Sequence, residues 1–125
     1  RPWDSLFSLG QPGTPLPREQ AGPYAQPLEM VRLAPSASNR QPWRVVRAPH
    51  RHTYHFFVRR IPSYDRNLRL LGLADLPRVD MGIAMCHFEL AAQEAGLQGG
   101  WSTDPPGESS SFPPEVTHIA SWIGC

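Results

Sequence analysis

The stretch LAPSASNRQPWR, residues 33–44, is the most informative segment of this 125-residue chain. Proline, serine and asparagine dominate it, and these residues favour turns, so we expect a loop. A short helix should precede the loop, because Leu28 and Val31 follow helical spacing and Pro35 prevents further helix. Trp43 to Arg47 should continue it as a strand.

On either side of this stretch, the alternation of apolar residues and turn formers predicts a hairpin and further strands. The remaining expected elements are a turn at 48–51, a strand at 52–58, a short helix at 68–76, a strand from Gly99, a loop at 104–114 and a strand at 116–123.

Residues 80–95 carry the strongest helical pattern. Asp80 at the start suits the positive end of the helix dipole, and Gly96 supplies a C-terminal stop. Apolar residues form two stripes, one through Phe88 and one through Leu90, so the helix is apolar most of the way round. We therefore expect it to be buried centrally.

Composition restricts the class of partner. The net charge is +1, which provides no strong field for nucleic acid or anionic lipid, and no apolar run reaches transmembrane length. All 12 basic residues are arginine, which excludes a lysine nucleophile within this chain. Cys86, expected to be a small buried residue, and Cys125 do not make a disulfide framework, so we expect a cytoplasmic location.

Residues 1–23 are rich in proline and glycine, which predicts an extended docking arm anchored by Trp3, Leu6 and Phe7. Residues 24–125 are then expected to form one domain with a modest core. The chain begins with Arg1 and not with Met, so we expect it to be an excerpt of a longer protein.

Other candidate sites are weaker. His50 and His52 would share one strand face while His55 points away, so a solvated hairpin is favoured over a metal site. Arg40 and Arg44 flank the loop, and either is able to reach a phosphate or a substrate carboxylate, with solvation at the surface as the alternative. No glycine-rich nucleotide loop, zinc-ligand spacing or serine-nucleophile elbow is present.

Three segments together resemble the FMN-dependent nitroreductase family, closest to the branch in which one chain contains two similar halves. They are LAPSASNRQPWR (33–44), DMGIAMCHFELAA (80–92) and IASWI (119–123), and they follow the family's order. The resemblance covers roughly residues 1–123 and identifies residues 24–125 as a C-terminal half-domain. It implies an α+β fold with a central sheet, a long buried helix and FMN at an interface between two halves or subunits.

In the family, the Pro-Ser-x-x-Asn loop lies against the flavin ring and ribityl chain. Carried over by position, the resemblance implies cofactor contacts from Pro35, Ser36, Ala37 and Asn39, with Gln41 as a neighbour. The hydroxyl of Ser36 and the amide of Asn39 are short donors of the kind that a flavin ring edge requires. The alternative is that these two side chains only cap a turn.

One departure from the family concerns the flavin phosphate. The family's Arg-x-Ser-x-Arg motif is absent, and RIPSYDR at 60–66 has a different spacing and contains an acid. A phosphate requires clustered arginines or helix N-termini. We therefore expect this part of the site to come from a missing N-terminal half or a partner subunit.

The resemblance implies that FMN transfers reducing equivalents from NAD(P)H to a nitroaromatic, quinone or similar small-molecule acceptor. No catalytic side chain is expected, because the flavin carries the chemistry. The alternative is a non-enzymatic, flavin-binding or degenerate half-domain that completes an interface.

Overall fold

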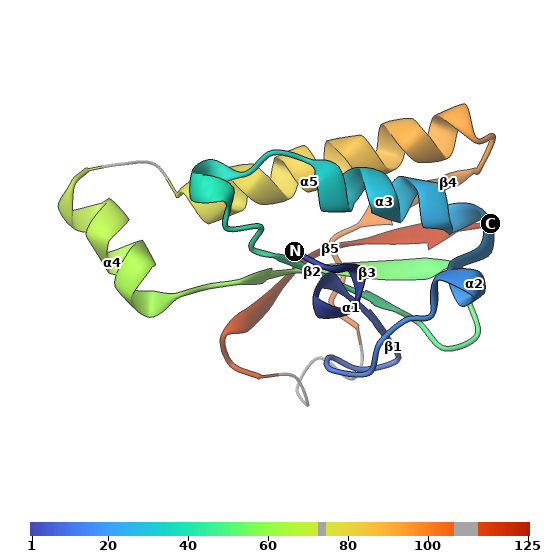
Figure 1. Cartoon of the computed structure of the whole chain (residues 1–125), viewed down its shortest axis with the longest axis horizontal. Helices are drawn as coiled ribbons and strands as arrows, with labels where there is room; N and C mark the ends of the chain where they lie inside the picture. Colours follow the sequence, from blue (N-terminus) through green and yellow to red (C-terminus); the bar gives the residue numbers. More distant parts are fainter. Residues whose placement is uncertain (73–74, 107–112) are drawn as a thin grey trace.

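The computed structural model describes residues 1–72, 75–106 and 113–125, and its centre is a five-stranded mixed sheet (Figure 1). The strand order is β1-β2-β3-β5-β4, with β1 parallel to β2 and the other pairs antiparallel. The strands are β1 (Phe7–Leu9), β2 (Trp43–Arg47), β3 (Thr53–Arg59), β4 (Gly99–Ser102) and β5 (Val116–Gly124).

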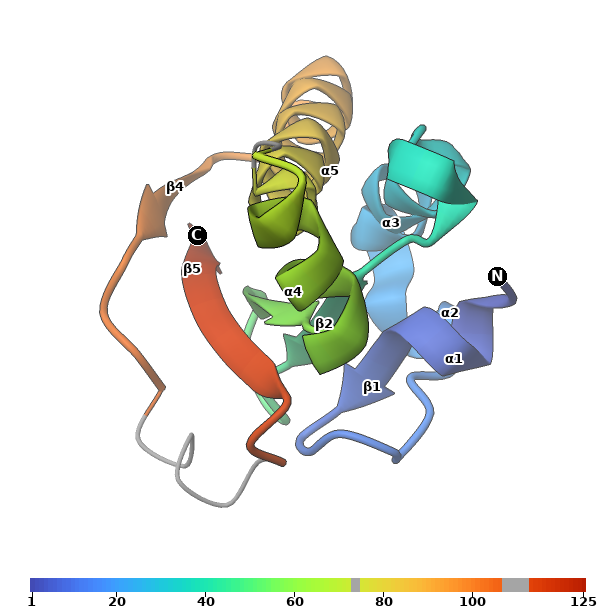
Figure 2. The same cartoon turned by 90° about the vertical axis from the view of Figure 1, so that its left-hand side faces the viewer.

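Helices α3 and α5 lie side by side over one face of the sheet, and α4 projects beyond one end of it (Figures 1 and 2). The helices are α1 (Trp3–Leu6), α2 (Arg18–Ala21), α3 (Ala25–Leu33), α4 (Pro62–Leu70) and α5 (Leu76–Glu94), with short 3₁₀ turns at Gly22–Tyr24 and Ala37–Asn39. This combination of helices with a mixed sheet confirms the predicted α+β class.

The core lies between this helix pair and the sheet, and Phe88 of α5 is at its centre. The Phe88 ring lies 5.2 to 6.0 Å, centroid to centroid, from five other aromatic rings. Those rings belong to Tyr24, Tyr54, Phe56, Trp101 and Trp122. The Trp122 indole N–H also donates to the Tyr24 hydroxyl at 3.1 Å, which joins β5 to the start of α3.

The hairpin, the helix before the loop and the last two strands are confirmed. Trp43 pairs with Val58, and Arg47 pairs with Tyr54, in the antiparallel register of a hairpin. Alternation along β2 places Trp43 in the core below the helices, and it places Arg44 on the opposite face of the sheet.

The prediction for the long helix is wrong in two respects. The helix begins at Leu76, after the N-cap Asp75, so Asp80 lies in its second turn. It is also not buried all round: the stripe through Phe88 meets the sheet, whereas Leu90 is 54% exposed and Cys86 is exposed. A single layer of sheet covers only one side of a helix, which explains the exposed second stripe.

The prediction of an extended arm at residues 1–23 is wrong in local structure. This segment contains two helical turns and β1, which forms parallel pairs with β2. Leu6, Phe7 and Leu16 are fully buried, because β1 satisfies its backbone groups on the edge of β2 and brings these side chains into the core. The division of the chain into an arm and a half-domain stays a prediction.

The helix predicted at 68–76 is displaced. Pro62 occupies its first turn, as proline favours, and the helix ends at Leu70. Residues 73–74 of that prediction, and 107–112 of the predicted loop, lie outside the described residues. None of the helices in the described part of the chain has the length and apolarity needed to cross a membrane.

Candidate functional site

The loop from Ala34 to Pro42 joins α3 to β2 and passes close to the N-terminal turns of α5 (Figure 1). Its backbone turns tightly, because the Asn39 N–H donates to the Ser36 carbonyl at 3.0 Å. Asn39 and Gln41 have φ angles of 53° and 48°, in the left-handed region. Asparagine enters that region more readily than most residues, which explains its place in this turn.

Two polar side chains support the loop from within. The Ser36 hydroxyl accepts the backbone N–H of Gln41 at 2.9 Å. The Gln41 amide donates to the Arg32 carbonyl at 2.6 Å, and Gln41 is only 5% exposed. The loop is therefore tied both to itself and to the end of α3.

A third support comes from α5. The carboxylate of Asp80 accepts the Ala37 backbone N–H at 3.1 and 3.2 Å, and Asp80 is 4% exposed. Burial raises the pKa of Asp80, and the hydrogen bond from Ala37 opposes that rise. A carboxylate that lies inside α5, and not at its start as predicted, thus holds the turn.

The five residues predicted to contact a cofactor are neighbours in space, but their environments differ. Pro35 and Asn39 are exposed, whereas Ser36 and Ala37 are half-buried. The Asn39 side chain forms no hydrogen bond within the described part of the chain, so its amide is available. Gln41 is buried and its amide already donates to the Arg32 carbonyl, so it supports the loop from within, and its contact with a cofactor stays a prediction.

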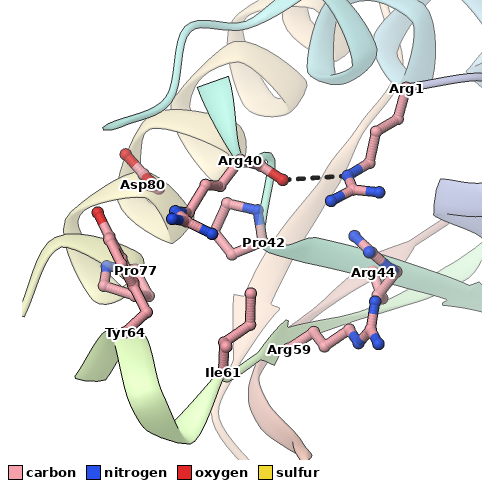
Figure 3. Close-up of a pocket in the computed structure, with 9 residues that line it drawn as sticks. All are labelled: Arg1, Arg40, Pro42, Arg44, Arg59, Ile61, Tyr64, Pro77 and Asp80. Atoms are coloured by element: carbon pink, nitrogen blue, oxygen red, sulfur yellow. Dashed lines mark hydrogen bonds between the residues drawn. The ribbon is translucent and has the colours of Figure 1, made fainter. Parts of the chain in front are cut away.

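Beside the loop lies a small pocket lined by four arginines, Arg1, Arg40, Arg44 and Arg59, which we call the arginine pocket (Figure 3). Arg40 comes from the loop, Arg44 from β2 and Arg59 from the end of β3. Its volume is about 20 Å³, close to that of a single water site, so a ring system does not fit inside it. Ile61, Tyr64 and Asp80 also line it.

The hairpin register positions two of these arginines. Arg44 pairs with Phe57, two residues before Arg59, so Arg44 and Arg59 are diagonal neighbours on one face of the sheet. One nitrogen of the Arg44 guanidinium, Nη1, donates to the carbonyls of Gln41 at 2.9 Å and Trp43 at 2.6 Å. Burial, followed by the positive charges of Arg1 and Arg59, lowers the pKa of Arg44 to about 10.

Arg40 is positioned by a different contact, with an aromatic ring of α4. Its guanidinium lies 4.1 Å from the centroid of the Tyr64 ring on α4. The sequence identified Arg40 and Arg44 as flanking the loop but missed Arg59. The signal that would have identified Arg59 is the pairing of the two predicted strands, which places it next to Arg44.

The histidines lie outside the loop and the arginine pocket, and His50 and His52 are not on the strand where they were predicted. His50 and His52 lie in the exposed turn before β3, so they do not share a strand face as predicted. On the sheet, the ring nitrogens of His55 and His118 lie 2.6 and 2.8 Å from the Ser121 hydroxyl. Among the described residues, no group of three His, Cys, Asp or Glu side chains is placed to hold a metal ion.

Comparison with models of protein families identifies a family that matches the chain. The model of a family described as "Putative TM nitroreductase" matches residues 19–92, more than half of the chain. The matched stretch contains α3, the loop, the hairpin and α5 as far as Ala92. No curated protein matches the chain.

Proposed function

The chain belongs to the nitroreductase family described as "Putative TM nitroreductase", and from this premise we propose that it supplies one side of the flavin site of an FMN-dependent oxidoreductase. The proposed reaction transfers reducing equivalents from NAD(P)H to a nitroaromatic, quinone or similar small-molecule acceptor. The observation that carries the proposal is the braced loop from Ala34 to Pro42, which lies within the matched residues.

The residues present fit the ring side of a flavin. The loop backbone is held by Asp80, by the Ser36 hydroxyl and by Gln41, so its outer surface is rigid. That surface presents the Pro35 ring and the unbonded Asn39 amide. A fixed apolar group beside a polar donor is the usual composition of a small-molecule site.

When bound, FMN supplies the hydride chemistry itself. The chain's own contribution is to hold and orient the ring edge through Pro35, Ser36, Ala37 and Asn39. Gln41 keeps Asn39 in its left-handed conformation by anchoring the end of the loop. No side chain of this loop has to transfer a proton.

We propose further that a second half or a partner subunit completes the flavin site. Val79 and Leu90 on α5 are 53% and 54% exposed, which supports burial of this helix face by another part of an assembly. The same feature favours the second candidate function, a non-enzymatic half-domain that binds flavin or completes an interface.

FMN titration of the full-length protein tests the proposal. Asn39→Gly keeps the left-handed backbone accessible but removes the amide, whereas Asn39→Ala removes the amide and also disfavours the backbone. If Asn39 contacts the ring, both variants weaken FMN binding by about 1–3 kcal/mol. Loss in Asn39→Ala alone would assign Asn39 to the turn, and wild-type affinity in both would contradict the contact.

Anaerobic bleaching of the bound flavin by NADH or NADPH separates the two functions. The oxidoreductase requires bleaching, followed by recovery of the yellow colour when a quinone or nitroaromatic acceptor is added. Flavin that remains oxidised under both nicotinamides identifies the binding half-domain.

A further inference from the structure

We infer that the arginine pocket is a binding site for an oxyanion of the phosphate class, bound through Arg40, Arg44 and Arg59. The pocket brings guanidinium groups from three separate elements to one place (Figure 3). The positive charges of these groups repel one another, and an anion bound between them would neutralise that repulsion.

The arginines of the pocket lack the carboxylate partners that Arg18, Arg32 and Arg60 have. Arg18 and Arg32 both pair with Glu29, and Arg60 pairs with Asp65 and Asp75. Within residues 1–72, 75–106 and 113–125, no carboxylate forms an ion pair with any arginine of the pocket.

The guanidinium of Arg44 is prearranged for a ligand. Its Nη1 atom is bonded to two carbonyls, which fixes the plane of the group and leaves Nη2 and Nε without a hydrogen bond in the described part of the chain. A planar guanidinium with free N–H groups matches the oxygens of a phosphate. Holding Arg44 in place before binding reduces the entropy lost when a ligand binds.

The walls of the pocket suit a compact anion. Ile61 and Pro77 contribute apolar surface, which lowers the local dielectric and strengthens attraction between opposite charges. The enclosed volume of about 20 Å³ is close to that of a single water site, so a phosphate group binds at the mouth of the pocket, against the guanidinium groups, and the rest of the ligand stays outside. The Tyr64 ring, beneath the Arg40 guanidinium, keeps that side chain at the edge of the pocket.

The acidic residues near the pocket do not neutralise its arginines by ion pairs. Asp80 lines it, but its carboxylate is engaged by the Ala37 N–H, and burial raises its pKa. Arg44 and Arg59 also border a wider hollow that Asp4 and Glu115 line, and neither acid forms an ion pair with them.

Titration of the full-length protein with inorganic phosphate at low ionic strength, followed by calorimetry, is the direct test. Saturable binding is expected, weakened about tenfold or more in Arg44→Gln or Arg59→Gln. Arg69→Gln, which removes an exposed arginine of α4 outside the pocket, is the matched control and should stay within about twofold of wild type. Asp80→Asn should bind phosphate more tightly, because it removes a negative charge from the pocket wall.

Absence of saturable binding would overturn the inference. Equal losses in Arg44→Gln and Arg69→Gln would also overturn it, because they would indicate a general effect of surface charge. Arg59 is exposed, so Arg59→Gln keeps the test decisive if Arg44→Gln fails to fold.

Two pairs of ligands that differ by one phosphate group, FMN with riboflavin and NADPH with NADH, identify the source of the phosphate. Tighter binding of FMN than of riboflavin, lost in Arg44→Gln, assigns the pocket to the flavin phosphate. Tighter binding of NADPH than of NADH, lost in the same variant, assigns the pocket to the nicotinamide nucleotide. If the protein shows neither preference, the pocket is assigned to free phosphate. If the protein binds phosphate but no flavin, the phosphate site is supported and the proposed function is contradicted. If it binds riboflavin but no phosphate, the proposed flavin site is supported and the phosphate site is contradicted.

Discussion

The carboxylate of Asp80 accepts the backbone N–H of Ala37 across 43 residues of sequence, with both carboxylate oxygens within 3.2 Å of the nitrogen. This contact connects α5, the longest helix described, to the loop that carries the candidate cofactor residues. The position of the loop therefore depends on the position of α5, and a perturbation of that helix should reach the site.

The first prediction concerns Asp80 itself. Asp80→Ala leaves the Ala37 N–H without its partner and should destabilise the fold by about 1–3 kcal/mol. Asp80→Asn keeps an acceptor and removes a charge that burial disfavours, so it should be as stable as wild type or more stable at pH 7. Urea unfolding of both variants measures this, and equal losses would show that the negative charge itself is required.

The same substitution has a predicted pH signature. Because burial raises the pKa of Asp80, the folded state holds its proton to higher pH than the unfolded state does. The contribution of Asp80 to stability should therefore fall as pH rises above about 4, the ordinary carboxyl pKa. Asp80→Asn should remove this part of the pH dependence, and an unchanged profile would contradict the prediction.

The second prediction concerns the aromatic core. Phe88→Ala should reduce the free energy of unfolding by about 3–5 kcal/mol, because it removes the ring at the centre of the cluster. Leu90→Ala, two residues away on the exposed side of α5, is the control and should reduce it by less than about 1 kcal/mol. Similar losses would mean that both faces of α5 are covered.

The third prediction concerns the close approach of β5 to the turn before β3. A Cβ atom on Gly124 would lie 2.7 Å from the His52 carbonyl oxygen and 2.5 Å from the Tyr24 hydroxyl. Gly124→Ala should therefore destabilise the fold by about 1–3 kcal/mol. Thermal unfolding of both variants measures this effect. Gly100→Ala, where a Cβ would meet nothing within 4 Å, should have little effect in that assay.

The fourth prediction concerns His118. Burial lowers the pKa of His118, so below pH of about 6.5 the unfolded chain binds a proton there before the folded chain does. Stability should therefore decrease as pH falls from about 6.5 towards the lowered pKa. His118→Gln should flatten this decrease in urea midpoints measured between pH 7.5 and 5.5, and an unchanged decrease would contradict the prediction.

Sequence alone determined the elements that rest on local preferences. The helix that ends before Pro35, the strand from Trp43 to Arg47 and the last strand all follow from helical or alternating spacing next to strong turn formers. The family's loop could also be found from sequence, because its residues are contiguous, and the family match includes it.

Which residues from distant segments meet depends on how those segments pack in three dimensions. Sequence could not show that the second stripe of α5 stays exposed, because burial depends on how many layers pack against a helix. Nor did it show that Arg59 joins Arg44 beside the loop, because the pairing register of β2 and β3 sets that contact. Periodicity acts within a few residues of the chain, whereas a site assembled from a loop, two strands and a helix depends on packing between segments far apart in sequence.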